Sequence, residues 1–288
     1  MQNQSPRKNI PAQHDRMQST TLVWIVTPLL AFGAAFPLIR AAAHGEALTP
    51  WIIPLILSLG FAALVWLLKA ATLPAASIGF LVCMILSQRR EVWIGLRPHP
   101  VQHSALAALI ALFVLTFLAT RFGRLKKESR KLAERRSGRR APQIVANLGV
   151  AALCGSAGWH SGCIAALAEA AADTVSSEVG QAIGGQVWLV TTWRRVAPGT
   201  DGGISVAGTG AGILGAALVA VIATMHHALW PDAAVIFFAA CAGLFFDSIL
   251  GATVEKYGWL GNDLVNFSAT CFAATIGFAA VLLRDKIF

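Results

Sequence analysis

The sequence predicts an all-α fold: a polytopic transmembrane helical bundle of about nine spans with no sizeable soluble domain. Hydrophobic residues make up 56% of the 288 residues, and charged residues only 13%. The apolar residues stand in long unbroken runs, and a spanning helix needs about 20 mostly apolar residues in a row. Because no paired-strand or βαβ pattern separates the runs, we expect any active site to lie in the helices or their loops.

Nine uncharged apolar runs are the expected spans. In chain order they cover residues 22–39, 51–68, 73–86, 104–120, 144–157, 161–173, 204–228, 233–249 and 267–283. The first follows a long polar tail without the small-residue cleavage site of a signal peptide, so we expect a retained helix. The next three contain almost no charge, and their prolines fit kinks or ends of membrane helices. The third, fifth and sixth are short, and the last three adjoin glycine-rich or acidic loops.

The net charge of +9 is concentrated in one loop. Residues 121–140 hold ten Lys or Arg against Glu128 and Glu134. Such loops stay in the cytoplasm and also attract anionic headgroups or phosphates at the membrane surface, so we expect no nucleic-acid partner. With the basic tail on the same side, nine spans place the N-terminus in the cytoplasm and the C-terminus outside. The loop that holds Arg89, Arg90 and Arg97 then lies outside, against the charge rule.

Charge and hydropathy divide the chain into four parts. We expect a cytoplasmic tail (1–20), an N-terminal four-span membrane region (21–120), a basic cytoplasmic loop (121–142) and a C-terminal membrane domain (143–288). The first four spans hold nothing catalytic, so the C-terminal domain is expected to carry the active site. By the same count its three polar segments share the cytoplasmic face, where nucleotides are available.

The first polar segment ends the sixth span. It places two carboxylates, Asp173 and Glu178, and several hydroxyls, Ser177 among them, at the mouth of an apolar helix. Ionisable groups at such positions are costly and usually functional, although a hydrated helix end is the alternative. Glu169 and Asp173 share a helix face. Asp173 and Glu178 point about 140° apart, so they can bind one cation only if the helix unwinds near Gly180.

The second polar segment is a glycine-dense loop that runs into the seventh span. Its candidate phosphate-binding residues are Pro198, Gly199, Thr200, Asp201, Gly202, Gly203 and Ser205, with Arg194 and Arg195 just upstream. Backbone N–H groups and the positive end of a helix suit phosphate, and arginine pairs with phosphate oxygens. The loop lacks the P-loop lysine and no strand precedes it, so neither common nucleotide-binding fingerprint applies.

The glycines of this segment have two interpretations besides an ordinary turn. If Gly202 and Gly203 offer their N–H groups to phosphate, an added methyl blocks the ligand and leaves the packing nearly untouched. Gly208 and Gly212, four residues apart, instead fit close packing between helices.

The third polar segment ends the eighth span with Asp247 and Ser248. It continues to Asn262 and Asn266, which lie four residues apart and share a helix face. Carboxylate and amide oxygens of this kind suit Mg²⁺, which takes a few carboxylates and completes its shell with phosphate and water.

Other ligands and nucleophiles are rejected. The five cysteines fall in apolar runs without metal-ligand spacing, and free Cys is commonly just buried. His226 and His227 fall at the expected outer side, and His160 stands alone in a Gly/Ser-rich turn.

These segments resemble one family. The motifs are ADTxxSExG at 172–180, VxPGTxGGxS and a GTxAG-like run at 196–212, DSxLGA at 247–252 and the Asn262/Asn266 pair, and Gln143 with Asn147 upstream also fits. The set is similar to the plant phytyl-phosphate kinases of the vitamin E pathway and the uncharacterised transmembrane protein 19 group, which have many bacterial and archaeal relatives. The resemblance covers roughly residues 124–283. More distantly, the motifs are similar to CTP-dependent dolichol kinases and CDP-diacylglycerol synthases.

The resemblance implies a membrane-embedded kinase that transfers a phosphoryl group from a nucleoside triphosphate, CTP being possible, to an isoprenoid monophosphate. Phosphoryl transfer needs positioning and charge neutralisation more than covalent chemistry. We therefore expect Mg²⁺ on the catalytic carboxylates Asp173, Glu178 and Asp247, with the glycine loop and Arg194 or Arg195 around the nucleotide phosphates. The expected polar support is Gln143, Asn147, Ser177, Ser248, Asn262 and Asn266. A bacterial inner membrane is the expected location.

Three rival functions stay open: a CTP-dependent lipid nucleotidyltransferase, a membrane transporter and a non-catalytic scaffold. A transporter places its polar residues near the bilayer midplane, whereas these cluster at one face. The acceptor lipid, the nucleotide base and the oligomeric state do not follow from the sequence.

Overall fold

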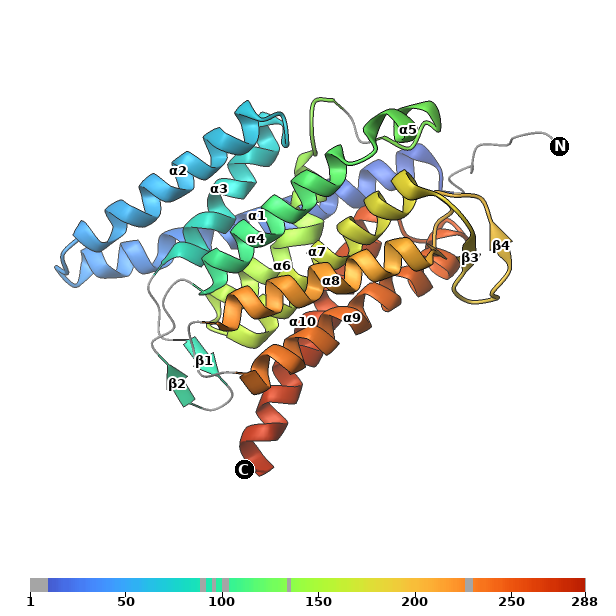
Figure 1. Cartoon of the computed structure of the whole chain (residues 1–288). Coiled ribbons are helices and arrows are strands. Elements are labelled where there is room, and N and C mark those ends of the chain that lie inside the picture. The colour runs from blue at the N-terminus through green and yellow to red at the C-terminus, as the bar shows by residue number, and fades with distance from the viewer. Residues whose placement is uncertain are drawn as a thin grey trace.

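The computed structural model describes residues 10–88, 92–94, 97–99, 104–133, 136–225 and 230–287. Its α-helices are α1 (Ala12–Ala43), α2 (Ile52–Leu67), α3 (Leu73–Ser87), α4 (Ser104–Arg121), α5 (Arg124–Ser129), α6 (Ala141–Ser156), α7 (His160–Ile183), α8 (Val206–Thr224), α9 (Trp230–Leu250) and α10 (Asn262–Ile287). A short 3-10 helix, η1 (Thr49–Trp51), leads into α2, and a π-helix, η2 (Gly251–Glu255), extends α9. Figure 1 shows the helices packed as one elongated bundle.

Six helices in the described part of the chain are long and apolar enough to cross a membrane. They are α1, α2 with η1, α4, α8, α9 with η2, and α10, and the shorter α3 and α6 are also apolar. Large apolar side chains such as Trp24, Phe32 and Leu118 stay exposed on the outer surface, as lipid-facing residues do. The expectation of an all-α membrane protein with multiple spans and no soluble domain is confirmed. Each of the nine expected apolar runs overlaps a helix, although residues 226–228 of the seventh run lie outside the described ranges.

Helix α7 lies at the centre of the bundle, where it packs against α4, α6, α8, α9 and α10. Every residue from His160 to Ala172 is buried, so this helix does not need a hydrophobic lipid-facing side, and it is not among the six long apolar helices. Small residues let its neighbours approach closely. A Cβ added to Gly208 or Gly212 of α8 would lie 2.6 Å from the Ser176 carbonyl oxygen or 2.7 Å from that of Ala172. The packing interpretation of these two glycines is confirmed.

The polar segments gather at one end of the bundle, which we call the polar end. In Figure 1, α5, the β3–β4 region and the α9–α10 connection lie towards that end, while β1, β2 and the end of α10 lie at the other. The start of α1 belongs to the polar end, because Gln18 Nε2 donates to the Trp259 carbonyl (2.8 Å) and Ser19 Oγ donates to Asp263 Oδ2 (2.6 Å). The polar segments thus share one end, as the span count requires.

Two small antiparallel sheets correct the expectation that no strands pair. Strand β1 (Val92–Ile94) pairs with β2 (Arg97–His99), and β3 (Val187–Leu189) lies between β4 (Arg195–Val196) and β5 (Gly203–Ile204). The glycine loop is therefore a hydrogen-bonded structure, in which Val190 N–H donates to the Gly202 carbonyl (3.1 Å). Such short strands carry too few residues for an alternating pattern to reveal them.

Some sequence-based interpretations concern residues outside those described. They are the polar tail up to residue 9, the outer-loop residues Arg89, Arg90 and Glu91, the basic-loop residues Glu134 and Arg135, and the rejected ligands His226 and His227.

Candidate functional site

A cavity opens at the polar end, between α6, α7, α9, η2, α10 and the glycine loop. We call it the polar cavity. It is lined by nearly all of the residues that the sequence suggested: Gln143, Asn147, Asp173, Ser177, Glu178, Pro198, Gly199, Thr200, Asp201, Gly202, Gly203, Ser205, Asp247, Ser248, Asn262 and Asn266. Segments more than 100 residues apart in the chain therefore meet around one space.

Arg194 and Arg195 do not line the polar cavity. Both are exposed, because the β3–β4 hairpin pairs Trp188 with Arg195 and turns back at Trp193, whose φ is +54°. Figure 1 shows β3 and β4 projecting from the end of the bundle. The hairpin carries the two arginines to the solvent side, away from the carboxylates.

Two carboxylates of the polar cavity, Asp173 on α7 and Asp247 on α9, lie close enough to repel each other when both are charged. Asp247 Oδ2 is buried and has no hydrogen-bond partner. Glu169, one turn before Asp173 and 1% exposed, also has a buried oxygen, Oε1, without a partner. Buried unpaired carboxylates are costly, so this part of the cavity is short of positive charge. A cation placed there would offset that shortage.

The residues fit Mg²⁺ that is shared with a phosphate ligand. Within the ranges that the structure describes, no three His, Cys, Asp or Glu side chains are grouped to hold a metal by themselves. Mg²⁺ typically binds through one or two carboxylates together with substrate phosphates and water, rather than in an all-protein cage. Asp173 and Asp247, with the orphaned Asp247 oxygen, provide such an incomplete set.

Glu178 is placed differently from the other two predicted metal ligands. Helix α7 stays helical to Ile183, so the unwinding that would let Asp173 and Glu178 share a cation does not occur. Glu178 instead forms an ion pair with Lys127, which is fully buried and also donates to the carbonyls of Ala119 (3.2 Å) and Thr120 (2.9 Å). This pair ties the basic loop to α7 and directs Glu178 towards Lys127 rather than towards Asp173.

The basic loop is organised by further contacts with acidic and carbonyl groups. Arg124 donates from Nε to Glu128 Oε1 (3.1 Å), and this hydrogen bond, with help from the charge of Arg136, holds the pKa of Glu128 below its usual value. Arg130 Nη1 donates to the Gln181 carbonyl (3.0 Å) near the end of α7. The basic loop therefore packs against the polar end of the bundle, in addition to indicating the membrane topology.

The glycine loop is seated tightly against η2. Gly202 has a φ of +72°, and a Cβ there would lie 2.3 Å from Ala252 N and 2.5 Å from the Ser248 carbonyl oxygen. A Cβ on Gly203 would lie 2.9 Å from the Thr200 carbonyl oxygen. The expectation that a methyl at these positions leaves packing untouched is wrong, because the loop's backbone already lies in contact with its neighbours.

Ser205 caps the N-terminus of α8. Its Oγ accepts a hydrogen bond from Gly208 N–H (3.1 Å), which satisfies one of the N–H groups that a helix start leaves open. Ser205 therefore orients the glycine loop at the mouth of the cavity, and its hydroxyl hydrogen can still be donated.

Side-chain amides connect α6 to α10 in the wall of the polar cavity. Asn266 Nδ2 donates to Asn147 Oδ1 (3.4 Å), and Asn147 Nδ2 donates to the Gln143 carbonyl (2.9 Å). Gln143 Oε1 in turn accepts from Arg140 N–H (2.7 Å) at the start of α6. The amides are thus held in place by one another, with Asn262 one helical turn before Asn266.

Sequence reasoning missed two charged residues of the polar cavity, Arg139 and Glu255. Arg139 Nη2 donates to Thr174 Oγ1 (3.3 Å), and its positive charge acts on the neighbouring Asp173. Arg139 is one of ten basic residues in the basic loop, so the sequence did not single it out. Its position just before a predicted span could have indicated that it lies near the cavity. Glu255 lies eight residues after Asp247, a spacing close to two helical turns that could have identified it.

Comparisons with known proteins agree with this assignment of fold and motifs. The family model for "Integral membrane protein DUF92" matches residues 56–274, which include all of the residues that line the polar cavity. The chain belongs to this family.

Three relatives illustrate its spread. An uncharacterised membrane protein of Synechocystis sp. is 35% identical over 58% of this chain and 70% of its own length. The chloroplastic protein VTE6 of Arabidopsis thaliana is 33% identical over 54% of this chain and 52% of its own. An uncharacterised membrane protein of Methanocaldococcus jannaschii is 33% identical over 60% and 74%, respectively. No solved structure matches the chain.

Proposed function

We propose that this DUF92 protein is a membrane-embedded prenyl-phosphate kinase, which transfers a phosphoryl group from a nucleoside triphosphate to an isoprenoid monophosphate of the phytyl-phosphate type. The observation that carries the proposal is the meeting of Asp173, Asp247, Arg139 and the glycine loop in one polar cavity at one end of a membrane bundle. The motif resemblance to plant phytyl-phosphate kinases supports it. The match to a chloroplastic plant protein is in keeping with that resemblance.

The proposed donor site uses the acidic half of the polar cavity. Asp173 and Asp247 would hold Mg²⁺, and the ion would neutralise phosphate charge. The glycine loop between Pro198 and Ser205 contacts the nucleotide phosphates through its backbone N–H groups and the start of α8. Arg139, beside Thr174 and Asp173, supplies a fixed positive charge on the α6 side of the cavity.

The proposed step is a direct displacement. An oxygen of the acceptor phosphate attacks the γ-phosphorus and forms a P–O–P bond. The bond from the γ-phosphorus to the β–γ bridging oxygen breaks, and that oxygen leaves with the electron pair on the nucleoside diphosphate. The acceptor phosphate is already ionised at neutral pH, so no side chain has to remove a proton, and the protein contributes positioning and charge neutralisation.

The proposed topology places the polar end in the cytoplasm, where nucleoside triphosphates are present. All nine helices other than α5 then cross the membrane, with the N-terminus inside and the C-terminus outside, in a bacterial inner membrane. The basic loop supports this orientation. Single cysteines introduced at Ser129 and at Asp285 should be labelled from opposite sides of the membrane, and labelling of both from the same side would refute the topology.

One assay separates this proposal from its rivals. Purified protein in nanodiscs is incubated with Mg²⁺, a panel of prenyl monophosphates, and CTP, GTP, UTP or ATP labelled at either the γ- or the α-phosphate. Label from the γ-position in a lipid diphosphate is the expected result, and it should disappear when EDTA removes Mg²⁺. Transfer of the α-label identifies a nucleotidyltransferase instead. No labelled lipid with any pair contradicts the kinase proposal and leaves the transporter and scaffold.

A further inference from the structure

A second pocket lies beside the polar cavity, between α2, α3, α4 and α6, and reaches α7. We call it the apolar pocket. Its apolar lining is Phe61, Val65, Ala70, Ala71, Ala75, Gly79, Leu109, Leu112, Phe113, Phe117, Ile144, Leu148 and Ala170. A mostly apolar lining with a few polar groups at one end is usual for small-molecule sites. The chemistry of the lining therefore suits a predominantly apolar ligand.

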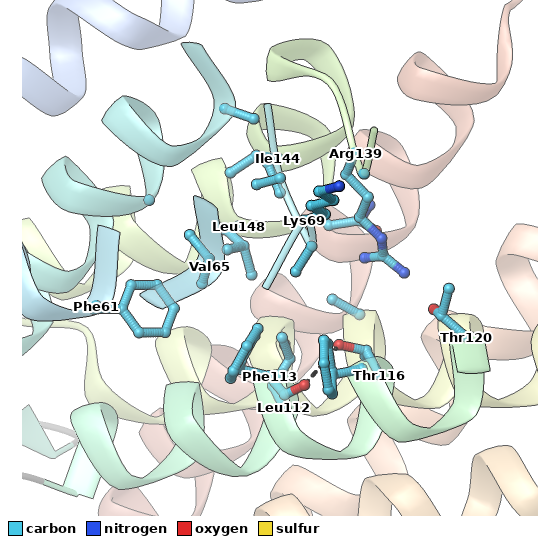
Figure 2. A pocket seen from close by; sticks show the side chains of 18 of the residues that line it. Phe61, Val65, Lys69, Leu112, Phe113, Thr116, Thr120, Arg139, Ile144 and Leu148 are labelled. Atoms are coloured by element: carbon cyan, nitrogen blue, oxygen red, sulfur yellow. Dashed lines mark hydrogen bonds between the residues drawn. The ribbon is translucent and has the colours of Figure 1, made fainter. Parts of the chain in front are cut away.

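One end of the apolar pocket is basic. Lys69, Arg121, Arg124 and Arg139 all line it, and none of its described lining residues is acidic. Figure 2 shows Lys69 and Arg139 close together at one end, with Phe61 at the far side beyond Val65. Arg124 Nη2 is buried and has no hydrogen-bond partner. The pocket thus combines an apolar body with a cationic rim, which is the complement of an anionic amphiphile.

The lining of the pocket follows α4, one of the helices long and apolar enough to cross a membrane. On α4 the lining extends from Leu109 to Arg121, roughly 18 Å at the rise of an α-helix. This is more than half of the roughly 30 Å hydrocarbon thickness of a bilayer. Because the rim lies at the basic loop, a ligand with its anionic group at the rim has its tail directed towards the bilayer centre.

The apolar pocket and the polar cavity meet. Arg139 and Asn147 line both, and Arg139 Nη2 reaches Thr174, the neighbour of Asp173. Arg139 is held in this position by its backbone, which donates to the Ala70 carbonyl (2.9 Å) and accepts from Thr72 N–H (3.0 Å). A phosphate at the basic rim therefore lies next to the space where the nucleotide phosphates are proposed to bind.

We propose that the apolar pocket is the acceptor subsite: it holds the isoprenoid chain of a single-chain phosphate monoester, whose phosphate contacts Lys69, Arg124 and Arg139 at the rim. This inference rests on the proposed kinase function and assigns the acceptor's place within it. Phosphate monoesters with two acyl chains share the headgroup chemistry, so the test includes one.

Equilibrium binding of tritium-labelled phytyl monophosphate tests the subsite without any catalysis. Wild-type protein and variants are compared in phosphatidylcholine nanodiscs without nucleotide, with empty nanodiscs as the background. Gly79→Leu fills the pocket, because a Cβ at Gly79 meets Phe61 at an ordinary 3.6 Å. Gly60→Leu is its matched control on α2, where a Cβ has no neighbour within 4 Å. Arg124→Gln removes a rim charge, and Lys126→Gln, exposed on the same short helix, is its control.

Gly79→Leu should weaken binding by at least about tenfold, since it removes space for several carbon atoms. Arg124→Gln should weaken binding by about tenfold or more through loss of a charged hydrogen bond. Both controls should stay within about twofold of the wild type. Excess unlabelled dioleoyl phosphatidate should compete poorly.

A crosslinking experiment on the wild-type protein tests the subsite even if the variants do not fold. Phytyl monophosphate with a diazirine at the tail end should crosslink to α2 or α4 near Phe61 or Phe113. Any one of four results would overturn the inference. These are crosslinks confined to the outer surface of α1, equal binding by Gly79→Leu and the wild type, efficient competition by phosphatidate, and no binding above empty nanodiscs. If the wild type nevertheless forms labelled lipid diphosphate, the kinase proposal survives that failure. If the subsite is confirmed without any phosphoryl transfer, the kinase proposal fails instead.

Discussion

The polar cavity and the apolar pocket lie side by side and share Arg139 and Asn147, yet their charges are opposite. The polar cavity is lined by the carboxylates Asp173, Glu178, Asp201, Asp247 and Glu255, whereas the apolar pocket is lined by Lys69, Arg121, Arg124 and Arg139 and by no described acid. An acidic site receives a polyanion only together with a cation, while a basic rim receives an anion directly. The difference supports the proposal of two sites for two unlike phosphate ligands.

The two regions are also built differently. The polar cavity is assembled around buried α7 and a glycine loop that is fixed by backbone contacts with η2. The apolar pocket lies between helices with exposed apolar surfaces such as α2 and α4. In the proposed function, an amphiphile from the bilayer enters the second region and a water-soluble nucleotide enters the first.

The largest expected effect is the loss of phosphoryl transfer when an aspartate of the polar cavity is neutralised. Asp173→Asn and Asp247→Asn keep the shape of the side chain and remove its charge, so each should lower phosphoryl transfer by at least about 100-fold, a loss typical of a lost transition-state contact. The assay is transfer of γ-label from nucleotide to prenyl monophosphate. Glu46→Gln, an exposed carboxylate at the other end of the molecule, should transfer as the wild type does. Near-normal rates in both aspartate variants would refute the metal assignment.

The next effect tests the residue that both sites share. Arg139→Gln should lower kcat/KM by about 10- to 100-fold, the equivalent of one or two charged hydrogen bonds, and should raise the KM of nucleotide and acceptor together. Its neighbour Arg140 is exposed and lines neither space, so Arg140→Gln should have KM values within about twofold of the wild type. A rise in only one KM would show that Arg139 belongs to one site and does not join the two.

A smaller effect tests how closely the glycine loop packs against η2. Gly202→Ala places a Cβ against η2 in a left-handed backbone conformation, which costs of the order of 1–3 kcal/mol. Thermal unfolding in detergent should therefore occur at a lower temperature. Gly210→Ala on α8, where a Cβ meets nothing within 4 Å, should be neutral or stabilising by about 0.5–1 kcal/mol. Equal melting of Gly202→Ala and the wild type would contradict the close seating of the loop.

The smallest effect concerns the two arginines that the sequence placed at the phosphates. Because Arg194 and Arg195 are exposed on the β3–β4 hairpin outside the polar cavity, Arg194→Gln and Arg195→Gln should each change kcat/KM by less than about twofold, as is usual for solvated charges. A tenfold loss in either variant would mean that the hairpin folds over the nucleotide during turnover.

The contrast between these arginines and Arg139 shows what sequence reasoning could reach. Local patterns located the helices, because a run of apolar residues reflects burial in lipid wherever the rest of the chain lies. The same patterns found Asp173, Asp247 and the glycine loop, since polar groups at the end of an apolar helix are conspicuous. Tertiary packing, by contrast, determines which charged side chains pair with each other. The ion pair of Lys127 with Glu178 joins residues 51 positions apart, and nothing in either local segment specifies the other.

The apolar pocket could not be predicted for a related reason. Its lining residues, such as Phe61, Leu112 and Leu148, are ordinary apolar residues of membrane helices, and only the packing of α2 against α4 and α6 leaves a space between them. The small β-sheet of the glycine loop could not be predicted either, because strands of two or three residues are too short to show an alternating pattern. Sequence therefore identified the donor side of the proposed reaction and missed the acceptor side.

Simultaneous binding is the most direct measurement of the two-site account. Binding of labelled phytyl monophosphate to the wild-type protein is measured with and without a saturating, non-hydrolysable nucleoside triphosphate analogue and Mg²⁺. Two adjacent sites predict that both ligands bind together, with an acceptor Kd that is unchanged or lower when the nucleotide analogue is present. Displacement of the prenyl phosphate by the nucleotide analogue would mean that one cavity receives both ligands, and it would contradict the division between the polar cavity and the apolar pocket.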